Sequence, residues 1–263
     1  MKKDIKKRNT ILTIILIGII FAYMLILQLN SASHSYAISI IERSAIYAVV
    51  AVAMNMLTGF TGLFSLGQAG FMAIGAYVTA ILIIPVESRP TVYYVNGIAP
   101  WLANVSLPWW LAMLLGGLIA AGFAALIGFP VLRLKSDYLA IATLGFAEII
   151  RAVIAAPGLN QITNGSYGLN TIPGYHSIFT PVIVSIICIA LMVMLLRSSY
   201  GRAFTAIRED EVAAEAMGIN LFKTKELAFI ISSFFTGIAG GLLAIYMRSI
   251  DAKTFQVTLT YTI

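Results

Sequence analysis

Residues 109–131 read WWLAMLLGGLIAAGFAALIGFPV, an apolar run without a single charged side chain. A helix rises about 1.5 Å per residue, so a run of this length can cross a hydrocarbon layer of ~30 Å. Backbone N–H and C=O groups find no water inside lipid, and a helix pairs them internally. The stretch therefore predicts a membrane-spanning helix.

Six further apolar runs repeat this pattern along the chain: 11–29, 38–57, 63–84, 138–156, 178–196 and 227–247. An eighth is expected to begin near Phe255, shortly before the final residue Ile263. The composition agrees, because 60% of the residues are hydrophobic and only 11% are charged. We predict an all-α fold, a polytopic transmembrane helical bundle of about seven to eight spans. It comprises a basic N-terminus, 1–10, and a transmembrane domain, 11–263.

The first run follows the basic stretch MKKDIKKR, an arrangement that also begins a signal peptide. Its length and the lack of a clear small-residue cleavage site favour a retained helix. Basic residues concentrate on the cytoplasmic side of membrane proteins. Twelve of the 17 Lys and Arg residues fall in segments that share one side if the N-terminus is cytoplasmic: 1–10, 58–62, 132–137 and 197–226. The predicted outer loops, 85–108 and 157–177, hold only Arg89 between them.

Composition also argues against several other kinds of protein. The chain has one cysteine, Cys188, and two histidines, so we expect no disulfide within the chain, no metal site and no cofactor. The net charge is +6, but the bases lie at the ends of apolar runs rather than in a stripe for nucleic acid. No GxxxxGK[ST] phosphate loop occurs, so we expect the chain itself not to be an ATPase. We predict no enzymatic activity and no catalytic residues.

Small residues recur at a spacing of four in the predicted spans. The run 109–131 has Gly116, Ala120, Ala124 and Gly128 in such a row, and Gly237 and Gly241 share the spacing in the last span. Small side chains let membrane helices approach closely. Two interpretations stay open: packing within one bundle, or a surface that meets a second subunit or slides during transport.

A charged segment interrupts the apolar pattern at 197–226. Its residues Glu209, Asp210 and Glu211 suit the positive end of a helix, and Gly218 suits its C-terminal stop. The spacing of Arg208, Glu211 and Glu215 predicts one polar stripe. A helix of about two turns is marginal alone, so we expect it to pack against a partner protein, or else to lie on lipid headgroups.

The stretch VAAEAMG (212–218) resembles the coupling loop of ABC importer permeases, whose form is Glu-Ala-Ala, three residues, then Gly. Val212 stands where that motif has Glu. Four longer stretches resemble, in order, the LivM-like branch of the branched-chain amino acid permeases. They are LTGFTGLFSLGQAGFMAIGAYVTAIL (57–82), LRLKSDYLAIATLGFAEIIR (132–151), TNGSYGLNTIPG (163–174) and REDEVAAEAMGINLFKTKELAF (208–229).

This resemblance implies a permease subunit of an ABC importer, with several passes through the inner or plasma membrane. The implied partners are a second permease subunit, cytoplasmic ATP-binding subunits and an extracytoplasmic substrate-binding protein. The implied solute is a branched-chain or other small amino acid. The resemblance assigns coupling to the ATPase to the following residues: Arg208, Glu209, Asp210, Glu211, Ala213, Ala214, Glu215 and Gly218.

Some alternatives remain open. Close relatives carry urea and short amides, and no residue separates these small polar solutes from amino acids. A self-contained secondary transporter would contain inverted repeats, of which none is clear here, and a membrane-anchored scaffold is a third class. Permeases of this family usually continue well past the point matching Ile263, so we expect the chain to be C-terminally truncated.

Polar residues inside the spans are candidates for a transport path, because polar groups are costly in lipid. Glu148 and Arg151 lie three residues apart and are expected to pair, either as a structural bridge or as a gating pair. Gln68 lies among glycines in the third span, where it either joins helices by hydrogen bonds or lines the path. Glu42 and Arg43 are assigned no role, because they open the second span at its solvated boundary.

Overall fold

The computed structural model describes residues 18–30, 34–95, 97–134, 136–175 and 177–262. The predicted basic N-terminus and the start of the first predicted span lie outside these residues. Within the described ranges the chain is helical, without strands, and an isolated antiparallel bridge joins Leu169 to Ile250. The predicted all-α class is confirmed.

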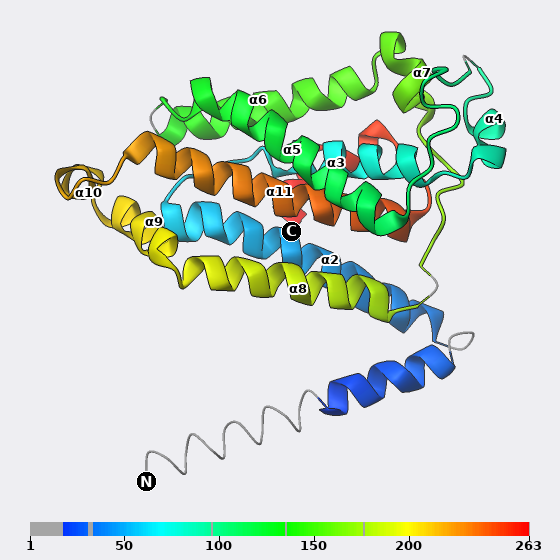
Figure 1. Ribbon diagram of the computed structural model, residues 1–263, viewed down its shortest axis with the longest axis horizontal. Coiled ribbons are helices and arrows are strands. Elements are labelled where there is room, and N and C mark those ends of the chain that lie inside the picture. Colours follow the sequence, from blue (N-terminus) through cyan, green and yellow to red (C-terminus); the bar gives the residue numbers. More distant parts are fainter. Residues whose placement is uncertain (1–17, 31–33, 96, 135, 176, 263) are drawn as a thin grey trace.

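The long helices lie side by side and connect at two opposite ends of the molecule (Figure 1). They are α2 (Ser35–Asn55), extended by the π-helical turn η1 (Met56–Phe60), and α3 (Gln68–Ile83), α5 (Trp109–Val131), α6 (Ser136–Ile154), α8 (Phe179–Leu196) and α11 (Leu221–Met247). Four are long and apolar enough to cross a membrane, and up to six spans result if each bent helix pair counts as one. A shorter apolar helix, Gly18–Leu29, precedes them. The polytopic architecture is therefore confirmed, with four to six candidate spans within the described residues.

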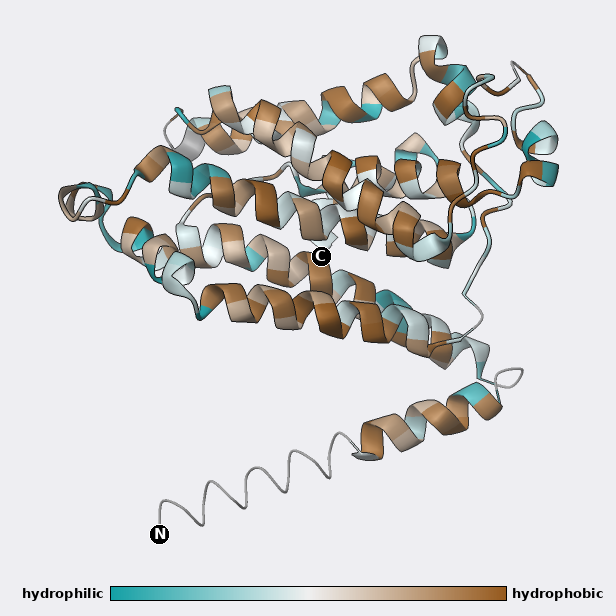
Figure 2. Ribbon diagram, viewed as in Figure 1, coloured by the Kyte–Doolittle hydropathy of each residue, from teal (hydrophilic) through white to brown (hydrophobic). Residues whose placement is uncertain are grey.

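Short elements connect the long helices or follow the last of them. They are η2 (Val86–Ser88), α4 (Arg89–Val92), η3 (Pro157–Leu159), α7 (Asn160–Thr163), η4 (Gly165–Tyr167), α9 (Ser199–Glu209), α10 (Glu211–Ala216), η5 (Ala252–Phe255) and α12 (Val257–Thr262). α9 and α10 lie at one end, and α4 and α7 lie at the other (Figure 1). Hydrophilic residues gather at both ends, with brown, apolar helices between them (Figure 2). Among the described residues, the loops 58–62 and 132–134 lie at the same end as the segment 197–226, as predicted for one side of a membrane.

The third predicted span needs a correction. The run 63–84 was expected to be helical throughout, but α3 begins only at Gln68. Gly62 adopts a φ of +74°, which is accessible to glycine, and the backbone stays non-helical up to Gly67. Hydroxyl groups replace the missing helical partners: Thr143 Oγ1 accepts from Leu66 N at 3.1 Å, and Ser65 Oγ accepts from Gly67 N at 3.3 Å. Apolar content alone could not reveal this start.

Close contacts between small residues build the core from α3, α5 and α11. A Cβ atom added at Gly237 would lie 2.7 Å from Cβ of Ala120, and one at Gly116 would lie 2.8 Å from the carbonyl oxygen of Gly75. Ala120 and Ala124 are fully buried. The rows of small residues therefore bring helices of one bundle together, which is the first of the two interpretations above.

A buried arginine organises the loop between α3 and α5. Arg89 is 2% exposed, and its guanidinium donates hydrogen bonds to the backbone carbonyl oxygens of Ala103 at 2.9 Å, Leu102 and Val105. A buried charge is tolerated where its donors are satisfied. Arg89 thus stabilises the loop instead of meeting solvent.

Candidate functional site

The charged segment folds into two helices, not one. Asp210 separates α9 from α10 in an extended conformation, and its Oδ1 accepts from Val212 N at 2.8 Å and Ala213 N at 3.0 Å. Asp210, rather than Glu209, is therefore the N-cap of α10. Because Arg208 belongs to α9, the predicted stripe of Arg208, Glu211 and Glu215 along one helix is wrong. Glu211 instead pairs with Lys225 Nζ of α11 at 2.7 Å.

Gly218 ends α10 as predicted. It has a φ of +85°, and its N–H donates to Glu215 O at 2.9 Å while Ile219 N donates to Ala214 O at 3.1 Å. These two bonds form the Schellman arrangement that closes a helix at a left-handed glycine. The cap at each end explains how a helix of only six residues persists at the surface.

α10 presents an apolar surface to its surroundings. Val212 is 78% exposed and Met217 is 84% exposed, and Ala213 between them is also exposed. Ala214 is buried against the chain, so of the two predicted contact alanines only Ala213 is accessible. We name the exposed residues Val212, Ala213 and Met217 the α10 surface. Exposed apolar side chains grouped on a short projecting helix are typical of a protein contact.

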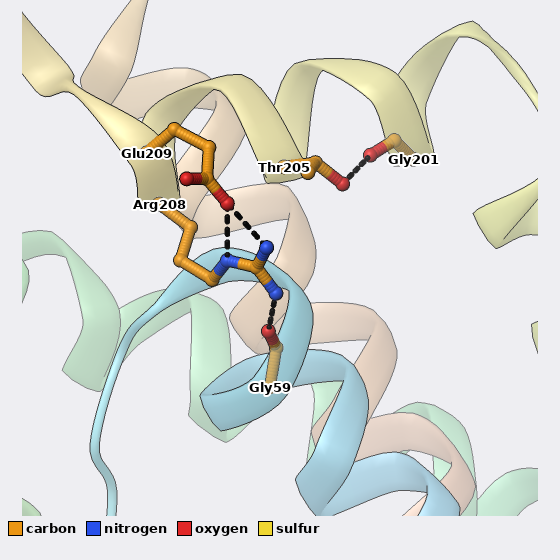
Figure 3. Close-up of polar contacts among 5 residues, drawn as sticks. All are labelled: Gly59, Gly201, Thr205, Arg208 and Glu209. Carbon is orange, nitrogen blue, oxygen red and sulfur yellow. Dashed lines mark hydrogen bonds and ion pairs between the residues drawn. The ribbon is translucent and has the colours of Figure 1, made fainter.

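Arg208 connects α9 to the η1 turn at the end of α2 (Figure 3). Its guanidinium donates to Gly59 O at 2.7 Å and pairs with the Glu209 carboxylate. A Cβ atom added at Gly62 would lie 3.1 Å from Cγ of Arg208. α9 thus rests on the η1 turn and on the non-helical segment that leads into α3. Sequence reasoning missed Gly59 and Gly62, because these contacts join residues far apart in the chain.

Gln68 lies at the N-terminal end of α3 and is 1% exposed. Its Nε2 donates to Ser232 Oγ at 3.1 Å, and its Oε1 accepts from Thr236 Oγ1 at 2.8 Å. Ser232 Oγ in turn donates to Ala53 O of α2 at 2.8 Å. This Gln68 cluster joins α2, α3 and α11, which is the hydrogen-bonding role considered for Gln68. Its hydroxyl members were missed, since Ser and Thr are too common in spans to single out.

Glu148 and Arg151 form the predicted ion pair on α6, with 2.7 Å between Arg151 Nη2 and Glu148 Oε2. The side chain of Glu148 is 37% exposed and that of Arg151 is 31% exposed. The neighbouring residue Ala147 packs on α3, where a Cβ atom added at Gly70 would lie 2.9 Å from Cα of Ala147. The pair therefore lies on a face of α6 that this chain leaves partly open, and it is separate from the Gln68 cluster.

Residues 36–263 match the family model described as the branched-chain amino acid transport system / permease component. The chain belongs to this family. Its members are membrane permeases, and the apolar helices of this chain agree with a multi-pass membrane protein.

Individual relatives agree with the assignment. The permease is 32% identical to the high-affinity branched-chain amino acid transport permease LivM of Salmonella typhimurium, over 83% of this chain and 55% of the relative. It is 32% identical to the Escherichia coli LivM, over 83% of this chain and 54% of the relative. It is 27% identical to a guanosine ABC transporter permease of Bacillus subtilis, over 78% of this chain and 66% of the relative. The chain spans about half the length of the two LivM proteins. No solved structure shows significant similarity to it.

Proposed function

We propose that this permease is a subunit of an ABC importer that moves branched-chain or other small amino acids across the inner or plasma membrane, driven by partner ATP-binding subunits. The names of the LivM relatives support the solute class. The second permease subunit, the extracytoplasmic binding protein and a cytoplasmic N-terminus belong to the same proposal.

The observation that carries the proposal is the α10 surface. A helix capped at both ends, with Val212 and Met217 exposed, lies at the same end as the loop that carries Arg133. This is the geometry expected of an element that inserts into a groove of another protein. We expect the ATP-binding subunit to contact Ala213, with Glu209, Asp210 and Glu215 near the edge of the contact.

The same geometry suggests how motion reaches the membrane helices. A displacement of α10 acts on α9, and Arg208 at the end of α9 bonds to Gly59 and lies against Gly62. The segment beyond Gly62 leads directly into α3. We infer that α9 transmits movement of the ATP-binding subunit to the start of α3 by these contacts.

Co-purification with the ATP-binding subunits tests the α10 surface. Ala213→Trp should abolish association, because an indole in place of an exposed methyl group prevents close approach. The exposed position should leave the fold intact, and Ala213→Ser, which adds little volume, is the matched control. If Ala213→Trp associates as strongly as the wild type, α10 is not the contact element.

A further inference from the structure

A cavity of about 650 Å³ opens at the end of the bundle opposite α10, between α2, α11 and the segment before α8. Its volume falls in the range of small-molecule sites, about 300–1,000 Å³. Glu42 lines one part of it and Arg248 another. The three ion pairs among the described residues include neither of them.

Glu42 lies deeper than the sequence suggested. α2 begins at Ser35 rather than at 38, so Glu42 is two turns, or about 10 Å, along the helix. The hydroxyl of Tyr175 borders the same cavity and donates to Leu242 O at 2.7 Å, which leaves its oxygen able to accept a hydrogen bond. Burial, and secondarily the charge of Glu42, raises the pKa of Tyr175 well above its ordinary value of 10.0, so this hydroxyl stays protonated.

Arg248 is held at the other part of the cavity by its backbone. It ends α11 with a φ of +57°, and its carbonyl oxygen accepts from Ile172 N at 3.1 Å. A Cβ atom added at Gly174 would lie 2.7 Å from Cζ of Arg248, so the absent side chain of Gly174 makes room for the guanidinium. Ile38, Ile178 and Met247 contribute apolar side chains to the lining. The rest of the lining comes from Gln28, Ser35, Ser39, Ser177 and Tyr246.

We propose that this cavity binds a zwitterionic aliphatic amino acid, with Glu42 recognising the ammonium group and Arg248 recognising the carboxylate. The Tyr175 oxygen accepts a further hydrogen bond from the ammonium group. The aliphatic side chain lies against Ile38 and Ile178. Charge-assisted hydrogen bonds of this kind are stronger than neutral ones, and the two charges exclude solutes that lack either group. The inference rests on the proposed function, since it names the site at which the amino acid is recognised.

Binding of radiolabelled L-leucine to the purified chain in lipid nanodiscs tests the inference directly. The competitors are L-leucinamide, which lacks the carboxylate, and 4-methylpentanoate, which lacks the ammonium group. The wild type should bind leucine saturably and each competitor at least about tenfold more weakly. Glu42→Gln should lose the preference for leucine over 4-methylpentanoate, and Arg248→Gln should lose the preference for leucine over leucinamide.

Arg43→Gln is the control, because Arg43 is an exposed neighbour that bonds to Tyr47 instead of lining the cavity. It should keep both preferences. The preferences are ratios within one variant, so a partial loss of folded protein does not change them. Absence of saturable leucine binding by the wild type, or persistence of both preferences in the two variants, overturns the site. ATP-dependent leucine uptake with an unchanged KM in Glu42→Gln would overturn the site while leaving the proposed function standing.

Discussion

Gln68 illustrates how one residue can hold several membrane helices in register. Its amide both donates to Ser232 and accepts from Thr236, so both ends of the side chain are satisfied in a site closed to solvent. Side-chain hydrogen bonds between membrane helices contribute only about 0.6–2 kcal/mol each, yet an unsatisfied buried amide costs more. The effect of replacing Gln68 therefore depends on what is left unpaired.

We expect Gln68→Leu to lower the free energy of unfolding by about 1–3 kcal/mol, because Leu has a similar size but leaves both hydroxyl groups without this partner. Thermal unfolding in detergent measures the loss. Gln256→Leu is the control, since Gln256 is exposed, and it should change stability by less than about 0.5 kcal/mol. Unchanged stability of Gln68→Leu together with abolished uptake would instead assign Gln68 to the transport path.

The Glu148–Arg151 ion pair on α6 has either a structural role or a gating role, and substitutions distinguish the two. If the pair is structural, Glu148→Gln or Arg151→Gln alone leaves the remaining charge without its partner, at a cost of about 1–3 kcal/mol. The double variant should then recover most of the stability and the uptake. Thermal stability and leucine uptake measured on all three variants check this.

If the double variant is stable but fails to transport, Glu148 and Arg151 act in gating. Full stability and transport in every variant would contradict both accounts.

At the scale of elements, the contact between α3 and α11 depends on glycine. A Cβ atom added at Gly240 would collide with the carbonyl oxygen of Met72 and lie 3.0 Å from its Cα, and a rigid backbone cannot yield as a flexible side chain can. Gly122 on α5 offers a contrast, because nothing lies within 4 Å of a Cβ added there.

Gly240→Val should therefore lower the free energy of unfolding by about 3 kcal/mol and reduce the yield of folded protein. Gly122→Val carries the same β-branched side chain in a helix but meets open space, so it should be tolerated. Parallel thermal unfolding of the two variants makes the comparison. If both variants lose the same stability, the loss comes from the β-branched side chain in a helix and not from the α3–α11 contact.

The sequence predicted some elements well and others poorly, for physical reasons. The bounds of α5 match the predicted 109–131, and α8 differs from 178–196 by one residue, because long apolar runs determine both helices. The Asp210 cap and the Gly218 stop were also predictable, since each acts on its own backbone neighbours. The late start of α3 was not, because Thr143, which accepts from Leu66, lies 77 residues further along the chain. The Gln68 cluster and the Arg208–Gly59 contact were beyond reach for the same reason.

At the scale of the whole molecule, the two ends have different chemistry. One end carries the α10 surface, the loop with Arg133 and the contact of Arg208 with η1. The other end carries the folded loops around α4 and α7 and the cavity lined by Glu42 and Arg248. The core of α3, α5 and α11 lies between them. In the proposed importer this arrangement separates recognition of the solute from use of ATP.

Uptake of L-leucine by proteoliposomes that hold the assembled transporter tests the central proposal most directly. The account predicts uptake that requires both ATP and the ATP-binding subunits, that exceeds uptake of urea, and that Ala213→Trp abolishes while Ala213→Ser does not. Robust leucine uptake by the chain without any ATP-binding subunit would contradict the account and favour a secondary transporter.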